Sequence, residues 1–332
     1  LQTATGISLI PAALIASIVT LAYTWSGGIL AVTLTDAVQY VIIVIGVTLC
    51  AYLAIDHLGG FDAMMSILYS NPRFETNMKP LANWSLVQFL GLFFSFLLGE
   101  FCAPYYIQRY ASTKSAKDSK NGLLIFGVHW IFFMATTAAI GLASMAIQPD
   151  VKPDLAFTNL IRDILPPGIT GLVFGALLAA VMSTGAAMIN TSAVIYTRDI
   201  YNKFINTAAT QAQLLRQSRL STLVVGGISI GVAIIFQDVF GLMIYMFKLW
   251  PSAILPPLMC GLLWGKISPY AGAPAVIAGG LSFFLWSDKV LGEPFGIPAN
   301  FIGIGMNCLV LFFVHQKMKG HKPEGPFLPD LN

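Results

Sequence analysis

The sequence predicts an all-α polytopic membrane protein, on two observations. Only 10% of the 332 residues are charged and 56% are hydrophobic, whereas soluble domains normally carry about 25% charged residues. The apolar residues also gather in long runs, each close to the ~20 residues that a helix needs to cross a bilayer. Because unpaired backbone groups are not tolerated in lipid, we expect all of these runs to be helical.

Nine membrane spans follow from this rule. They cover residues 7–26, 33–55, 86–106, 122–147, 169–195, 219–236, 239–264, 270–287 and 298–315. Two long connections, 57–85 and 148–168, leave room for short surface helices. We therefore assign residues 1–315 to a transmembrane domain and 316–332 to a tail.

The basic residues predict the orientation. Alternation of the nine spans places twelve of the 18 Lys and Arg residues on one side and five on the other, with Lys248 inside a span. Loops rich in Lys and Arg stay in the cytoplasm, so we expect a plasma (inner) membrane protein whose tail is cytoplasmic. The chain starts at Leu1 without an initiator Met, which favours a piece of a longer protein.

A run of small residues, 175–187, contains the first candidate site. At helical spacing, Ala180, Ser183 and Thr184 fall on one narrow, weakly polar face. Two hydroxyls beside a backbone carbonyl offer three uncharged oxygens, which suit a weakly held alkali cation better than a transition metal. The alternative is that these small residues only let two helices pack closely.

Ionisable residues inside spans are further candidates, because burying them in lipid is costly. Asp36 either caps the second span or takes part in ion passage. Glu100 is bracketed by Gly99 and Pro104, which suggests a helix broken beside a cavity. Lys248 is too deep to reach the surface easily, and Glu100 is the acid predicted to pair with it. Such a pair would act in solute binding or gating, unless it is purely structural.

His129 and Trp130 lie near the start of the fourth span. A single His there is either an interhelical hydrogen-bonding residue or a proton carrier. Prolines 251, 256 and 257 predict a kinked or hinged seventh span. The four cysteines occur singly, without metal-ligand spacing, so we expect free, buried thiols.

Three stretches in order and register resemble the sodium/solute symporter family, which includes proline, sugar, sialate, pantothenate and iodide transporters. They are residues 23–39 with Thr35-Asp36-Ala37-Val38-Gln39, residues 108–115 with Gln108-Arg109-Tyr110, and residues 179–201 with Ser183-Thr184 and Arg198-Asp199. The resemblance covers nearly the whole chain. It implies an inverted-repeat fold of five plus five helices, of which the first three core helices are missing here.

The resemblance also implies sodium-coupled symport of a small polar solute by alternating access. The carbonyl of Ala180 and the hydroxyls of Ser183 and Thr184 match half of the family's sodium site. Some members hold a second sodium through hydroxyls that match Ala186 and Ala187, so we expect one sodium here. Trp130 stands where sugar members carry a Lys, which argues against a sugar and slightly favours a carboxylate-bearing or zwitterionic solute.

Sodium, a solute and the lipid bilayer are the partners expected, with no nucleic acid and no obligate protein partner. Three alternatives stay open: a transporter-like sensor module, an intramembrane enzyme and a truncated fragment that does not transport. No catalytic cluster of His, Asp, Glu or Cys is visible in the sequence, so we expect that the protein is not an enzyme.

Overall fold

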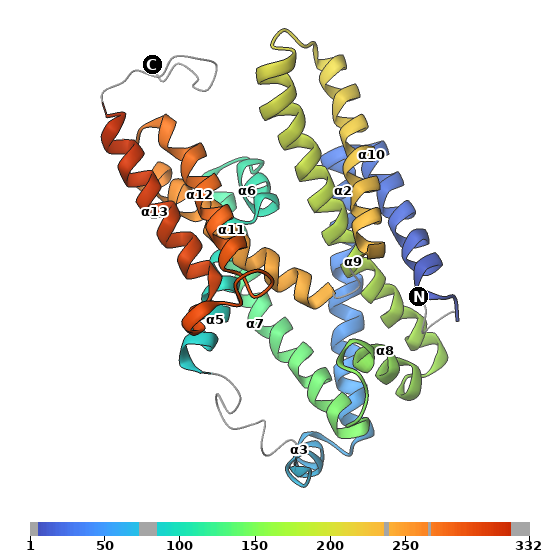
Figure 1. The fold of residues 1–332 in the computed structure, drawn as a ribbon. Coiled ribbons are helices and arrows are strands. Elements are labelled where there is room, and N and C mark those ends of the chain that lie inside the picture. Colours follow the sequence, from blue (N-terminus) through green and yellow to red (C-terminus); the bar gives the residue numbers. More distant parts are fainter. Residues whose placement is uncertain (1–5, 73–84, 236–238, 265–266, 320–332) are drawn as a thin grey trace. The chain divides into compact units, whose positions relative to one another are not determined.

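The computed structural model describes residues 6–72, 85–235, 239–264 and 267–319, and within them every regular element is a helix. Figure 1 shows the helices along the chain. They are α2 (Leu9–His57), α3 (Phe61–Tyr69), α5 (Leu86–Cys102), α6 (Pro104–Ala111), α7 (Ala116–Ile147), α8 (Pro153–Ile164), α9 (Pro167–Ile195) continued by the π-helix η1 (Tyr196–Ile205), α10 (Gln211–Ile235), α11 (Val239–Trp264), the 3₁₀ turn η2 (Pro269–Ala271), α12 (Gly272–Trp286), the 3₁₀ turn η3 (Pro294–Gly296) and α13 (Ala299–Lys317). The tail expected at 316–332 lies mostly outside the described residues.

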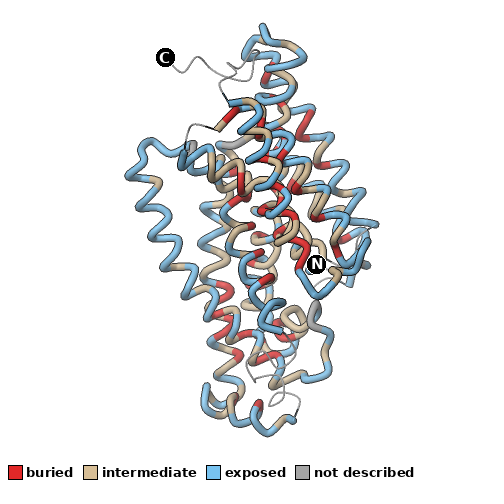
Figure 2. The backbone as a smooth tube through the Cα atoms, turned by 60° about the vertical axis from the view of Figure 1, so that its left-hand side comes forward, coloured by how far each residue is buried: buried red, intermediate tan, exposed pale blue. Residues whose placement is uncertain are grey.

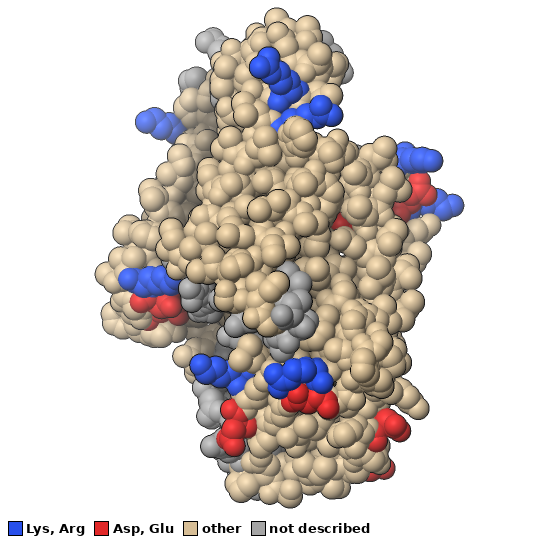
Figure 3. All heavy atoms as spheres, turned by 90° about the vertical axis from the view of Figure 1, so that its right-hand side faces the viewer, with Lys and Arg blue, Asp and Glu red and all other residues tan. Residues whose placement is uncertain are grey.

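The described residues contain all nine expected spans. Eight helical segments are long and apolar enough to cross a membrane, and α5 with α6, a pair bent by 43°, makes nine when the pair is counted as one span. Many large apolar residues are exposed, and exposed residues, drawn pale blue, recur along the helices in Figure 2. Few charged groups interrupt the uncharged surface in Figure 3. Both features agree with a protein that lipid surrounds.

The first two spans differ from the expected arrangement. We expected a connection over 27–32, but α2 consists of two helical segments that meet directly at Gly28, whose φ and ψ are 57° and −152°. Residues with a Cβ atom rarely adopt this conformation. The second span therefore begins at Leu30, almost directly after the glycine.

The described residues separate into two compact units. The first unit contains α2, α3, α7, α8, α9, η1 and α10, in which α2 packs along α9. Gly46 of α2 allows this close approach, since a Cβ there would lie 2.7 Å from that of Ala176. The expected surface helices are present as α3 and α8, and their apolar residues join the core formed by α2, α7 and α9.

The second unit contains α5, α6, α11, α12 and α13, and α11 contacts α5, α12 and α13. Pro251, Pro256 and Pro257 lie inside α11, and each proline removes the N–H that would bond to the carbonyl four residues earlier. Pro256 and Pro257 thus release the carbonyls of Ser252 and Ala253. The side-chain amide of Asn307 on α13 donates to both, over 3.0 and 2.7 Å.

Replacing Asn307 by alanine is expected to destabilise the protein by about 2–3 kcal/mol, because two buried carbonyls lose their donor in an apolar medium. Reversible unfolding in mixed detergent micelles would measure the change. Asn300→Ala is the matched control, because the amide of Asn300 is equally buried but has no hydrogen-bond partner among the described residues. Equal losses in the two variants would show that the hydrogen bonds of Asn307 contribute nothing.

The cysteines are free, but the expectation that all are buried is wrong. Cys50 and Cys102 are buried, Cys260 is half-buried and Cys308 is exposed. Cys308 lies in the span α13 on a face that is not buried in the protein core, so its thiol faces the apolar medium around the helix.

Candidate functional site

The three oxygens predicted from the small-residue run lie within one turn of α9. The hydroxyls of Ser183 and Thr184 both donate to the carbonyl of Ala180, over 3.0 and 3.1 Å. The face they belong to is buried at its ends, at Ala176 and Ala187, whereas Ser183 is half-buried and Thr184 is exposed. The hydroxyl lone pairs thus remain accessible at the middle of the helix, where three hard, neutral oxygens can supply part of an alkali-cation shell.

Tyr23 of α2 holds the turn that carries these oxygens. Its hydroxyl donates to the carbonyl of Met182 over 3.0 Å and also hydrogen-bonds with the side chain of Gln39. Asp36 interacts electrostatically with the same tyrosine. Asp36, Tyr23 and the carbonyl of Met182, which precedes Ser183, therefore lie in one polar cluster inside the first unit.

The alternative in which Asp36 caps the second span is wrong. A capping carboxylate lies at the first residues of a helix, but the span begins at Leu30. Asp36 lies more than one helical turn beyond that start. The span begins this early because the chain turns at Gly28, without the loop that we expected up to residue 32.

The break expected at Glu100 is present. α5 ends at Cys102, Ala103 is extended with ψ of 120°, and α6 begins at Pro104. The Glu100 side chain hydrogen-bonds with the hydroxyl of Tyr106 in the following helix. This acid is thus held by a neutral donor across the break.

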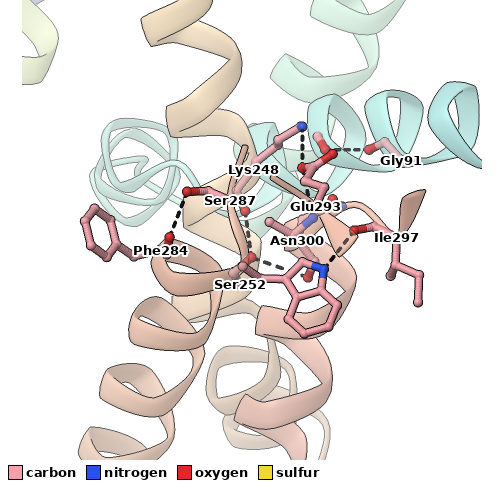
Figure 4. Close-up of polar contacts among 11 residues, drawn as sticks. Gly91, Lys248, Ser252, Phe284, Ser287, Glu293, Ile297 and Asn300 are labelled. Atoms are coloured by element: carbon pink, nitrogen blue, oxygen red, sulfur yellow. Dashed lines mark hydrogen bonds and ion pairs between the residues drawn. The ribbon is translucent and has the colours of Figure 1, made fainter. Parts of the chain in front are cut away.

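The ion pair predicted between Lys248 and Glu100 is wrong. The Lys248 ammonium lies 3.1 Å from Oε1 of Glu293, in the connection between α12 and α13, as Figure 4 shows. The same oxygen accepts the backbone N–H of Ala299 over 3.1 Å. Glu100 is the acid whose predicted depth in the membrane is closest to that of Lys248. The connection between α12 and α13, however, folds back towards α11, so that Glu293 reaches the lysine.

His129 and Trp130 lie in aromatic contacts on α7. The His129 ring meets that of Tyr40 edge-on, with centroids 5.0 Å apart, and Trp130 stacks on Phe126 and Phe133. The contact of His129 agrees with packing between α2 and α7, whereas the contacts of Trp130 lie within α7.

Sequence reasoning missed Glu293 and Asn307. Glu293 sits between Gly292 and Pro294 in a connection, and neither local pattern nor span depth marks it as a partner. A signal was available for Asn307, since an amide inside a span must find hydrogen-bond partners and Pro256-Pro257 must release carbonyls.

Comparison with known proteins places the chain in a family. Residues 1–279 match the profile of the sodium:solute symporter family. The osmoregulated proline transporter OpuE of Bacillus subtilis is 28% identical over 286 residues, which are 83% of this chain and 56% of that protein. The sodium/proline symporter of Escherichia coli is 26% identical over 81% of this chain and 55% of its own length.

A solved structure of a Na⁺-coupled sialic acid symporter, in a substrate-bound outward-open state, shares the fold. Its TM-score is 0.71 at 20% identity, over 98% of this chain and 69% of the symporter. The chain spans little more than half the length of the curated relatives it matches first. These relatives are transporters, not enzymes. With a profile that matches 279 of its 332 residues, the chain belongs to the sodium:solute symporter family.

Proposed function

We propose that this protein carries out sodium-coupled symport of a small polar organic solute across the plasma membrane by alternating access. The observation that carries the proposal is the accessible turn of α9, in which the Ala180 carbonyl meets the hydroxyls of Ser183 and Thr184, in a member of a sodium:solute symporter family. These three oxygens would supply one half of the coordination shell of a bound sodium ion. We propose a single ion because Ala186 and Ala187, which match the second sodium site of some members, offer no hydroxyl.

One sodium ion supplies enough free energy for this task. Moving one charge across 100 mV releases about 2.3 kcal/mol, and a tenfold concentration gradient adds about 1.4 kcal/mol. Together these could concentrate a neutral solute a few hundred-fold. Coupling requires only that sodium favours the state that binds solute better.

For the solute we propose a carboxylate-bearing or zwitterionic compound, with proline the first to test. Relatives named as proline transporters or sodium/proline symporters support this choice. Asp36, Glu100 and Lys248 are proposed to act in solute binding or gating, whereas the aromatic contacts of His129 and Trp130 favour a packing role for these two. The 316–332 segment is proposed to be a cytoplasmic tail.

Uptake into proteoliposomes that contain the complete protein tests the proposal. We expect radiolabelled proline to accumulate when a sodium gradient is imposed and not when potassium replaces sodium on both sides. A panel of monocarboxylates, sialate and sugars would locate the solute class if proline is not moved. Sodium-independent equilibration of every solute in the panel would contradict symport.

A further inference from the structure

A cavity of about 260 Å³ lies beside the Lys248–Glu293 pair, entirely within the second unit. Both charged side chains line it, together with Gln88 and Leu92 of α5 and Ile244 of α11. The volume is slightly below the range of typical ligand pockets, which suits a compound of a few heavy atoms. We infer that this cavity binds a small zwitterion of the α-amino-acid type.

The two charges leave bonding capacity for such a ligand. An ammonium has three N–H donors and a carboxylate has two accepting oxygens. Among the described residues, the Lys248 ammonium contacts only Oε1 of Glu293, and Oε2 of Glu293 accepts no hydrogen bond. The side chains are 22% and 23% exposed, so they are accessible from the cavity but largely removed from water.

Charge balance selects the class of ligand. An anion bound to Lys248 alone would take the ammonium from Glu293 and leave that carboxylate half-buried without its cation, and a cation on Glu293 would do the reverse. A zwitterion places its carboxylate on Lys248 and its ammonium on Glu293, so that every charge stays compensated. The neutral pair therefore favours a ligand whose net charge is also zero but which carries both signs.

The connection between α12 and α13 fixes the position of the carboxylate. Glu293 has a φ of 48°, and Phe295 nearby has a φ of 59°, which is costly for residues with a side chain. The Glu293 N–H donates to the carbonyl of Trp286, and the indole of Trp286 donates to the carbonyl of Ile297. With the bond from Ala299 to Oε1, these contacts hold the acid against Lys248 (Figure 4).

The inference deepens the proposed function and rests on it only for the fate of the ligand, because binding to the cavity needs neither sodium nor transport. In the proposed orientation, the connection that carries Glu293 is on the outer side of the membrane. The cavity would then hold solute arriving from outside.

Equilibrium binding by calorimetry tests the site, with the purified full chain in detergent and no sodium. Three probes of nearly equal shape separate the charges: alanine has both, isobutyrate has only the carboxylate and 3-methylbutan-2-amine only the ammonium. We expect alanine to bind at least tenfold more tightly than either of the others. Glu293→Gln and Lys248→Met should each weaken alanine binding by about tenfold or more.

A filled-cavity variant and its control locate the site. Leu92→Trp places an indole in the cavity while keeping both charged side chains, and it should abolish alanine binding. Leu97→Trp, on the same helix but away from the cavity lining, should bind as the unsubstituted protein does. Glu293→Gln keeps an acceptor for Ala299, and thermal unfolding of each variant reports whether it is folded.

Absence of alanine binding to the folded protein would overturn the inference, as would binding that survives Glu293→Gln or Leu92→Trp. Sodium-driven uptake by a protein that shows no such binding would leave the proposed function intact and remove this site. Binding without any sodium-driven uptake would leave the site intact and remove the proposed function.

Discussion

Replacing Gly279 by alanine is expected to lower the free energy of unfolding by about 3 kcal/mol. A Cβ at this position in α12 would lie 2.1 Å from the backbone carbonyl oxygen of Ser252 in α11 and 2.9 Å from Cβ of Asn307 in α13. A backbone oxygen cannot rotate away as a side chain can, so the helices must separate. Overpacking of this kind costs typically 1–3 kcal/mol, and here it also disturbs the bonds from Asn307 to Ser252 and Ala253.

Gly280→Ala provides the matched control on the next residue of the same helix. A Cβ there would meet only the Cβ of Ala253, at an ordinary 3.9 Å. Because alanine favours helix more than glycine does, this change should be neutral or stabilise the protein by up to about 1 kcal/mol. Unfolding in mixed micelles measures both variants. A similar small effect of the two substitutions would mean that α12 does not approach α11 as closely as described.

Replacing Ser183 or Thr184 by alanine is expected to raise the sodium concentration for half-maximal uptake by about tenfold or more. Each substitution removes one oxygen from the proposed ion shell, and an oxygen contact to a charged partner contributes on the order of 1.5–3 kcal/mol. At saturating sodium, the solute concentration for half-maximal uptake should stay near its original value, because the solute contacts are untouched.

Two variants sharpen this test. Thr184→Ser keeps a hydroxyl and should keep the sodium requirement close to that of the unsubstituted protein. Ser192→Ala removes an exposed hydroxyl on the same helix, two turns further on, and should leave uptake unchanged. A loss of solute affinity at saturating sodium that equals the loss at low sodium would contradict a role in ion binding.

Much of the fold could be predicted from the sequence because the bilayer imposes it. A span must be apolar and helical, so the nine runs, the break at Glu100 and the surface helices α3 and α8 are visible as composition and proline position. The direct turn at Gly28 between the first two spans was not, since a glycine pair between two apolar runs is equally compatible with a longer loop. Only the backbone angles of Gly28 distinguish the two.

The candidate site was less predictable, because side-chain partners depend on tertiary structure. The small face of α9 could be located by spacing alone, since its oxygens belong to one turn. The partner of Lys248 could not, because depth in a span says nothing of a connection that folds back towards the helix. Glu293 reaches the lysine through a left-handed backbone conformation that sequence pattern does not predict for a glutamate.

The proline pair in α11 has a consequence for how the protein is made. The carbonyls of Ser252 and Ala253 enter the membrane with α11, but their donor, Asn307, lies about fifty residues later in the chain. Until that part of α13 has been synthesised and inserted, these two carbonyls of α11 have no hydrogen-bond donor. Unpaired backbone groups in an apolar medium destabilise a membrane helix. Biosynthesis therefore leaves α11 incomplete as a membrane helix until α13 has joined it, so α11, α12 and α13 assemble as one unit.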